Sequence, residues 1–119
     1  LASGKYDFDR DRVVALGYSN GANIAASLLF HYEGALQGAI LHHPMVPRRG
    51  ITLPSLSDIP VFIAAGKNDP ICPAAETDEL NQILLQAGAA VNVHWENYGH
   101  QLTRSEVDAA SSWFQKNFL

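Results

Sequence analysis

The sequence is poor in cysteine and in basic residues, and it has no long apolar run. Cys72 is the single cysteine among 119 residues, so no internal disulfide can form, which fits a reducing compartment. Eight lysines and arginines stand against twelve acidic residues, and the formal net charge is −4. Without a basic stripe to neutralise phosphates, we expect no nucleic-acid partner. The apolar runs are far shorter than a membrane span, so we expect no transmembrane segment, and the lone cysteine leads us to expect a cytoplasmic protein.

What remains is typical of one packed globular domain. The hydrophobic fraction is 47% and the charged fraction 17%, which excludes a disordered chain. Short apolar runs alternate with helical patterns, and this alternation favours an α/β fold with a parallel sheet and covering helices. The predicted strands are Val13–Gly17, Gly38–His43, Pro60–Gly66 and Ala90–Glu96, and the predicted helices are Asn20–Tyr32, Ala74–Ala87 and Thr103–Phe118.

The apolar patterns also predict where these elements lie. The run Val13–Gly17 has no alternation, which indicates a strand buried on both faces. The segment Asn20–Tyr32 is apolar on nearly all sides and is therefore expected to be a buried helix. In contrast, Ala90–Glu96 alternates apolar and polar residues, a pattern that suits a strand near the edge of the sheet.

A G-x-S-x-G motif lies between the first predicted strand and the first predicted helix. It reads Gly17-Tyr18-Ser19-Asn20-Gly21, and in this context it is typical of a nucleophilic serine on a sharp turn. We expect both glycines to be required, because side chains two residues either side of the serine would collide in so tight a turn. The alternative is a strand-to-helix turn with an incidental serine.

A serine hydroxyl needs a base, and five histidines are available. His100 lies in a loop after the last predicted strand and before the last predicted helix, where a Ser-Asp-His order places the base. His31 falls late in a helix and is expected to be structural, and His94 is expected to be solvated. His42 and His43 end a strand on the same side of the sheet as the serine, where they could line a pocket.

The base in turn needs a carboxylate to orient it, and Asp69 is the best-placed candidate. It follows the third predicted strand, at the carboxyl end of the sheet where the serine and His100 also emerge. Pro70 and Pro73 would stiffen its turn. An Asn-Asp-Pro turn without a catalytic role is the alternative. The poorer candidates, in a loop or on helix surfaces, are Asp58, Asp78 and Asp108.

These segments resemble the phospholipase/carboxylesterase family of α/β-hydrolases, which are relatives of acyl-protein thioesterases and dienelactone hydrolases. The resemblance covers nearly the whole chain. The stretches that carry it are Asp11-Arg12-Val13, Gly17-Tyr18-Ser19-Asn20-Gly21-Ala22-Asn23, Leu41-His42-His43-Pro44-Met45, Gly66–Pro73 and Gly99-His100-Gln101-Leu102.

The resemblance implies a serine carboxylesterase that hydrolyses carboxylic esters or thioesters through an acyl-enzyme. Ser19 would be the nucleophile, Asp69 the acid and His100 the base, and no metal or organic cofactor is implied. The backbone N–H of Asn20 would be one oxyanion donor. Alternatives on the same fold are a lactone or dienelactone hydrolase and a peptidase, and a further alternative is a non-catalytic truncated module.

Members of that family carry several more strands before the nucleophile strand. We therefore expect residues 1–119 to be the C-terminal half of an α/β-hydrolase catalytic domain, without the N-terminal strands and without the loop that supplies the second oxyanion donor. The strand Val13–Gly17 would then be an open apolar edge, and we expect self-association through it.

The substrate is expected to be a small-molecule ester or thioester in a modest apolar acyl site. The candidate walls of that site flank the triad segments, and ordinary core or loop packing is an equally good interpretation for each of them. They are Tyr18, Met45, Val46, Ile71 and Leu102.

Overall fold

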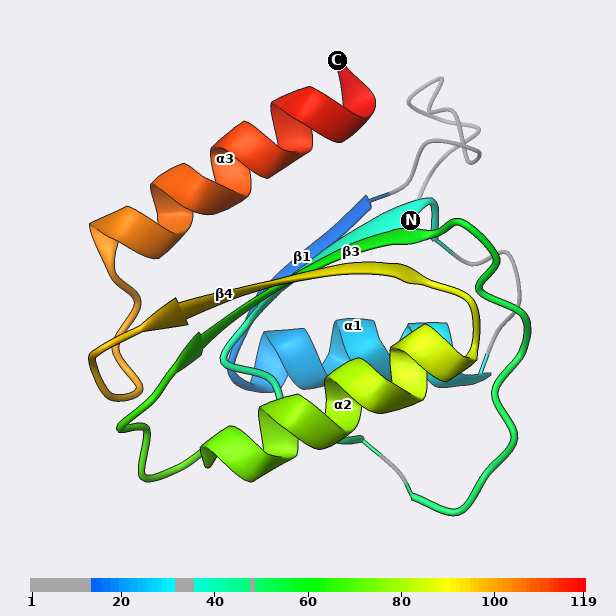
Figure 1. Ribbon diagram of the computed structural model, residues 1–119, viewed down its shortest axis with the longest axis horizontal. Helices are drawn as coiled ribbons and strands as arrows, with labels where there is room; N and C mark the ends of the chain where they lie inside the picture. The colour runs from blue at the N-terminus through cyan, green and yellow to red at the C-terminus, as the bar shows by residue number, and fades with distance from the viewer. Residues whose placement is uncertain (1–13, 32–35, 48) are drawn as a thin grey trace, which may run out of the picture.

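The centre of the molecule is a four-stranded parallel sheet with the strand order β1-β2-β3-β4 (Figure 1). The computed structural model describes residues 14–31, 36–47 and 49–119. The strands are β1 (Val14–Tyr18), β2 (Gly38–His42), β3 (Pro60–Gly66) and β4 (Ala90–Glu96). In the register, Leu16 pairs with Ile40, Ile40 with Phe62, and Phe62 with Asn92. The predicted parallel α/β architecture is confirmed.

Helices cover both faces of the sheet. Helices α1 (Asn20–His31) and α2 (Ala74–Gln86) lie on one face, and α3 (Arg104–Phe118) crosses the other (Figure 1). The larger core lies beneath α1 and α2 and contains Leu29, Phe30, Leu41, Ile63, Leu80 and Leu84. The smaller core lies beneath α3 and contains Ile40, Phe62, Ala64, Ala110 and Trp113. Adjacent strand residues thus feed opposite cores, as the period of two in a strand requires.

The ends of the elements agree with the predicted ones to within a residue where the structure describes them. Thr103 caps α3 rather than beginning it, and its side chain and that of Glu106 form a reciprocal capping box. His43 leaves the strand with φ 57°, so β2 stops at His42. Val13 and Tyr32, which the sequence placed in a strand and a helix, lie outside the described residues.

Two predictions of burial are wrong. Strand β1 is not buried on both faces, because Leu16 is 70% exposed. Within the described part of the chain β1 has only β2 beside it, so it is an edge strand. Helix α1 is not buried on all sides either, since Ile24 is 66% exposed. Only the alanine-rich face of α1 packs on the sheet.

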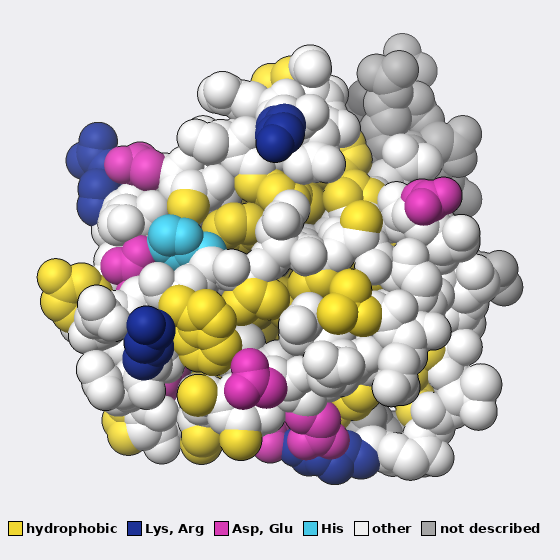
Figure 2. Space-filling model, viewed as in Figure 1, with side chains coloured by type: hydrophobic (Ala, Val, Ile, Leu, Met, Phe, Trp, Pro, Cys, Tyr) yellow, Lys and Arg dark blue, Asp and Glu magenta, His cyan; other side chains and the backbone are white. Residues whose placement is uncertain are grey.

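Strand β4 forms the opposite edge of the sheet, as its alternating pattern predicts. Val91 and Val93 pack against the core beneath α2, whereas the His94 ring stacks on Phe62 on the other face. Figure 2 shows hydrophobic side chains gathered on this side of the molecule, between α3 and α2. Among the described residues, no helix combines the length and the apolar character needed to cross a membrane.

Candidate active site

Ser19 occupies the sharp turn between β1 and α1, and its backbone is in the left-handed region with φ 56°. That conformation is uncommon for a residue with a side chain, and it persists only where the surroundings impose it. Here the Ser19 N–H donates to the carbonyl of His42 over 2.9 Å, and the Ser19 carbonyl accepts from the N–H of Asn23 over 3.0 Å. The turn is thus tied both to strand β2 and to the first turn of α1.

The two glycines of the motif differ in what they do. A Cβ added at Gly17 would lie 2.3 Å from the carbonyl carbon of Gly21 and 2.5 Å from the N of Ala22, so only glycine fits there. A Cβ added at Gly21 would meet nothing within 4 Å. The expectation that both glycines are required is therefore wrong at Gly21 as far as the described residues are concerned. Gly21 sits in the first turn of α1, with open space where its side chain would be.

His100 reaches Ser19 from the loop between β4 and α3. Its Nε2 lies 2.9 Å from Ser19 Oγ, and its Nδ1 lies 2.7 Å from Asp69 Oδ2. A carboxylate only accepts, so the ring proton is assigned to Nδ1, which leaves Nε2 to accept from the serine hydroxyl. The Tyr18 hydroxyl donates to the His100 carbonyl over 2.7 Å. The tyrosine beside the nucleophile thus holds the backbone of the histidine loop.

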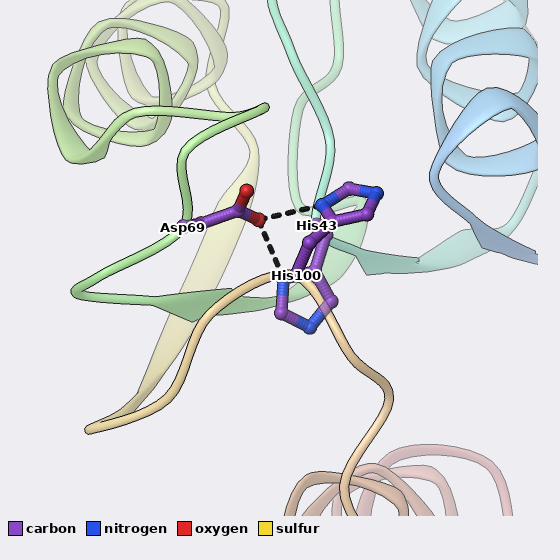
Figure 3. A group of neighbouring side chains, drawn as sticks. All are labelled: His43, Asp69 and His100. Atoms are coloured by element: carbon purple, nitrogen blue, oxygen red, sulfur yellow. Dashed lines mark hydrogen bonds and ion pairs between the residues drawn. The ribbon is translucent and has the colours of Figure 1, made fainter.

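Asp69 is a buried carboxylate held by four donors. Its Oδ1 accepts the backbone N–H groups of Ile71 and Cys72, at 2.8 and 2.9 Å. Its Oδ2 is shared by the Nδ1 atoms of His100 and His43, at 2.7 and 3.1 Å (Figure 3). Burial favours the neutral acid, but the hydrogen bonds from Cys72, His100, Ile71 and His43 outweigh it and lower the pKa of Asp69 below its usual value. The carboxylate is therefore ionised at neutral pH.

The loop that carries Asp69 and the loop that carries His100 are held against each other. A Cβ at Gly66 would lie 2.2 Å from the carbonyl oxygen of Gly99, so glycine at the end of β3 lets the second loop approach. The Asn68 N–H donates to the carbonyl of Tyr98 over 3.2 Å, and the Asn68 amide donates to the carbonyl of Asn97 over 3.2 Å. These contacts fix the distance between the carboxylate and the imidazole.

Negative charge next to Ser19 Oγ would meet the N-terminus of α1. Asn20 is the first residue of that helix, so its backbone N–H has no acceptor within the helix. The helix dipole also favours an anion at this end. The role of the Asn20 N–H as an oxyanion donor stays a prediction.

His43, Asp69 and His100 present ligand atoms that all lie within 4.8 Å of one another (Figure 3). Two imidazoles and a carboxylate are a donor set that divalent transition metals accept. In this site, however, both imidazole Nδ1 atoms already face the same Asp69 oxygen. The group is therefore arranged as hydrogen-bond donors around one acceptor.

Sequence reasoning missed Glu106 and the part played by the histidine doublet. Glu106 is fully buried, and its carboxylate lies 2.7 Å from His42 Nδ1 and 2.9 Å from His43 Nε2. Burial raises the pKa of Glu106, but hydrogen bonds from His42, His43 and the Thr103 N–H lower it by more. The Thr-x-x-Glu pattern at 103–106 signals the start of a helix, but it does not report that Glu106 is buried beside two histidines.

The other histidines have different surroundings. His31 is exposed at the end of α1. His94 is not simply solvated, because its Nε2 lies 2.5 Å from Glu96 Oε2 and its ring stacks on Phe62. This hydrogen bond, opposed by burial, lowers the pKa of Glu96. Neither histidine is among the hydrogen-bond partners of Asp69.

Cys72 is next to the triad but is a poor nucleophile. Its thiol is buried and donates to the His43 carbonyl over 3.2 Å. Burial, together with the charges of Asp69 and Glu76, raises the pKa of Cys72 to about 11. Since the thiolate is the reactive form, this residue is expected to be inert.

The predicted pocket walls divide between two apolar hollows. Tyr18 and Leu102 line a cavity of about 630 Å³ between β1 and α3. Met45 and Val46 line a more open hollow of about 550 Å³ beside the start of α1. Ile71 lines neither of them and is 59% exposed. Four of the five residues therefore lie in hollows, though not in a single one.

The parallel strands in sequential order, with helices on both faces, form part of an α/β-hydrolase fold. Residues 2–114 match the dienelactone hydrolase family, and the chain belongs to that family. It is 56% identical over 115 residues to MhqD of Bacillus subtilis (strain 168), a protein named only as a hydrolase, and the match covers 97% of this chain and 58% of that protein.

The chain is also similar to two solved structures of carboxylesterases. A Bacillus cereus carboxylesterase is 63% identical, with a TM-score of 0.96, and the match covers 98% of this chain and 55% of that one. A carboxylesterase from Mesorhizobium loti is 27% identical, with a TM-score of 0.88, over 96% of this chain and 54% of that one. The chain thus spans little more than half the length of these relatives.

Proposed function

We propose that the chain is the catalytic half of a serine hydrolase that cleaves carboxylic esters or thioesters. The observation that carries the proposal is the unbroken series of hydrogen bonds from Ser19 Oγ to His100 and from His100 to Asp69, at 2.9 and 2.7 Å. The carboxylesterase names of similar proteins support an ester as the substrate. No cofactor is needed for this chemistry.

In the proposed mechanism, Ser19 Oγ attacks the acyl carbon while His100 Nε2 takes the hydroxyl proton. Asp69 keeps the imidazole in the required tautomer and stabilises the imidazolium that forms. The Asn20 N–H and the α1 dipole stabilise the oxyanion. The bond to the leaving alkoxide or thiolate then breaks, and His100 returns the proton to that group. Water, with His100 as base, finally releases the carboxylic acid and frees Ser19.

The relatives are longer than this chain, so the proposal includes a contribution from a further segment. An oxyanion site of this fold uses a second backbone donor from an earlier loop. Losing one such donor costs about 3 kcal/mol in the transition state, or ~100-fold in rate. We therefore expect the chain alone to be at least about 100-fold slower than a form that has the second donor.

The test is labelling by a fluorophosphonate probe. It would use the chain alone and the chain preceded by the N-terminal segment of the Bacillus subtilis relative, which we call the joined chain. We expect rapid labelling of the joined chain, slow labelling of the chain alone, and none in Ser19→Ala. Ser112→Ala removes an exposed serine of α3 and should label normally. Equal labelling of Ser19→Ala and the unaltered joined chain would contradict the proposal.

The class of substrate is tested separately, with aryl esters, thioesters, lactones and amides. We expect the joined chain to turn over aryl esters and thioesters fastest. The dienelactone hydrolase family match makes a lactone hydrolase the second candidate, which faster lactone turnover would support. Fastest turnover of amides would instead indicate a peptidase. If nothing is turned over and no probe is bound, the chain is a non-catalytic module.

A further inference from the structure

The hydrogen-bonded series does not stop at the catalytic acid. It continues from Asp69 into the buried end of β2 and the first turn of α3, and each link joins an imidazole to a carboxylate. No step of the proposed mechanism uses this continuation. In order from the nucleophile, the members are Ser19, His100, Asp69, His43, Glu106 and His42.

His43 lies between two carboxylates. Its Nδ1 is 3.1 Å from Asp69 Oδ2 and its Nε2 is 2.9 Å from Glu106 Oε1. An ionised carboxylate can only accept a hydrogen bond, so each of these contacts needs a proton on the imidazole nitrogen. Hydrogen bonds lower the pKa of both Asp69 and Glu106, which makes both of them acceptors at neutral pH. Both contacts are hydrogen bonds at once only if the imidazole carries a proton on each nitrogen.

We propose that His43, donating from both ring nitrogens, is a positioning residue for Asp69, and that Glu106 keeps it in this doubly protonated state. The inference rests on the proposed function, because it assigns a task to residues behind the triad. His43 does not touch the nucleophile. It acts on His100 through the Asp69 oxygen that the two imidazoles share.

The backbone conformation of His43 indicates that the surrounding structure holds this residue in place. Its φ of 57° is in the left-handed region, which is unfavourable for histidine unless the surroundings hold it. The side chain is 1% exposed, and its ring meets that of His100 edge to face, with 5.3 Å between centroids. In this conformation both ring nitrogens lie within hydrogen-bond distance of a carboxylate oxygen.

Glu106 links this arrangement to the loop that carries the base. Its Oε1 accepts from His43 Nε2 over 2.9 Å and from the Thr103 N–H over 3.1 Å. Thr103 ends the loop that begins after β4 and contains His100. One carboxylate oxygen therefore joins His43, which follows β2, to the end of the loop that carries His100.

The groups that face His43 come from every element packed against it. They include two acids, one further imidazole, one phenol and one thiol, and the thiol contacts the His43 carbonyl rather than its ring. They are Asp69 before α2, Glu106 on α3, His100 before α3, Tyr18 on β1 and Cys72 before α2. Of these, the two acids lie within hydrogen-bond distance of the ring nitrogens and would hold its charge.

Two substitutions at His43 test whether the hydrogen bond it donates to Asp69, rather than the space its ring fills, affects catalysis. His43→Asn places an amide nitrogen near the position of Nδ1 and suits the left-handed backbone, so it keeps a donor toward Asp69. His43→Leu fills the space without a donor. In the joined chain we expect His43→Leu to lower kcat about tenfold, the usual effect of one lost hydrogen bond to a charged group. KM should stay within about twofold, and His43→Asn should recover kcat to within about threefold.

A third variant tests the part played by Glu106. Glu106→Gln removes the charge but keeps a side chain that can complete the Thr103 cap. Ring nitrogen NMR of the unaltered joined chain at pH 7 should show protons on both nitrogens of His43, since each faces a carboxylate oxygen. Glu106→Gln at the same pH should show a proton on one of these nitrogens only. The matched control is Glu96→Gln, which removes the charge of the carboxylate that faces His94 and should leave both the His43 signals and kcat unchanged.

The outcomes distinguish this inference from the proposed function. If the unaltered joined chain hydrolyses esters but a folded His43→Leu keeps full kcat, the positioning role is wrong and the triad stands. Equal losses in His43→Leu and His43→Asn would also contradict it. A single ring proton on His43 at pH 7 would overturn the protonation state even if the histidine variants do not fold. No hydrolysis by the unaltered joined chain would instead contradict the proposed function.

Discussion

The carboxyl rim of the sheet and its β1 edge differ sharply in how complete they are. At the rim, Asp69 and Glu106 are buried, and each has several hydrogen-bond donors. At the edge, Leu16 is 70% exposed and Tyr18 40%, and both line the hollow between β1 and α3. A buried carboxylate without partners is costly, whereas exposed apolar side chains on a strand edge favour pairing with another chain.

The two regions have different tasks: the rim carries the proposed triad, and the β1 edge carries the strand that precedes the nucleophile turn. All the side chains of the proposed triad come from residues 19–100, and their hydrogen bonds close within this chain. The strand that carries the nucleophile turn is nevertheless the least covered strand of the sheet. We therefore expect substitutions at the rim to act on catalysis and acid stability, and substitutions at the edge to act on association.

The largest effect is expected at the base. In the joined chain, His100→Gln removes the proton acceptor for Ser19, and kcat should fall about 10⁴-fold or more. The measurement is aryl ester hydrolysis under saturating substrate. His94→Gln is the matched control, because His94 pairs with Glu96 rather than Asp69 and should keep kcat within about twofold. Comparable losses in both variants would remove the distinction between the rim and the rest of the sheet.

The two glycines of the serine turn give the next largest effect. Gly17→Ala forces a Cβ to within 2.3 Å of backbone, and overpacking of this kind costs about 2–3 kcal/mol. Gly21→Ala has open space and should be neutral or stabilise by up to about 1 kcal/mol, because alanine is the better helix former. Urea unfolding of the joined chain measures both. A larger loss of stability in Gly21→Ala than in Gly17→Ala would contradict the steric account of the turn.

Acid stability tests the buried carboxylates. The pKa values of Asp69 and Glu106 are lowered in the folded state, so each contributes stability above its unfolded pKa of about 4. That stability is lost as the pH falls through the folded pKa. Asp69→Asn should therefore lower the unfolding free energy at pH 7 and flatten its fall below pH 4, by up to ~1.4 kcal/mol per pH unit. Urea unfolding at pH 7, 4 and 3 measures this. Asp78→Asn, at an exposed site, should leave the slope unchanged.

The smallest expected effect is at the open edge. We expect the chain alone to self-associate through β1, and Leu16→Glu to shift it toward monomer by placing charge on the exposed apolar strand. Sedimentation of the chain alone over a range of concentrations measures the change. Asn92→Glu, at an exposed position of the opposite edge strand, is the control and should not shift the equilibrium. A monomeric unaltered chain would contradict the association.

Sequence patterns predicted most of this fold because its elements are locally consistent. The apolar run at Pro60–Gly66 and the alternation at Ala90–Glu96 match β3 and β4 residue for residue. Burial was predicted less well, because it depends on neighbours that periodicity does not report. Leu16 belongs to an apolar run and is nevertheless exposed, since β1 is an edge in this chain.

In the candidate site, too, the order of residues along the chain was predictable, whereas burial and close backbone contacts were not. The order of Ser19, Asp69 and His100 along the chain was readable, because turns after parallel strands gather at one rim. Glu106 was not identified, because on sequence it is one acid among the polar residues of α3. It is fully buried because the first turn of α3 packs against His42 and His43 at the end of β2. The different demands at Gly17 and Gly21 likewise depend on how closely the backbone folds back.

The central claim is that the hydroxyl of Ser19 becomes covalently acylated during turnover. The direct measurement is mass spectrometry of the joined chain, quenched with acid during the first turnovers of an aryl ester. We expect one added acyl group per chain, located on the peptide that contains Ser19, and we expect it to disappear as substrate runs out. Turnover with no acyl adduct, or with the adduct on another side chain such as Cys72, would contradict it.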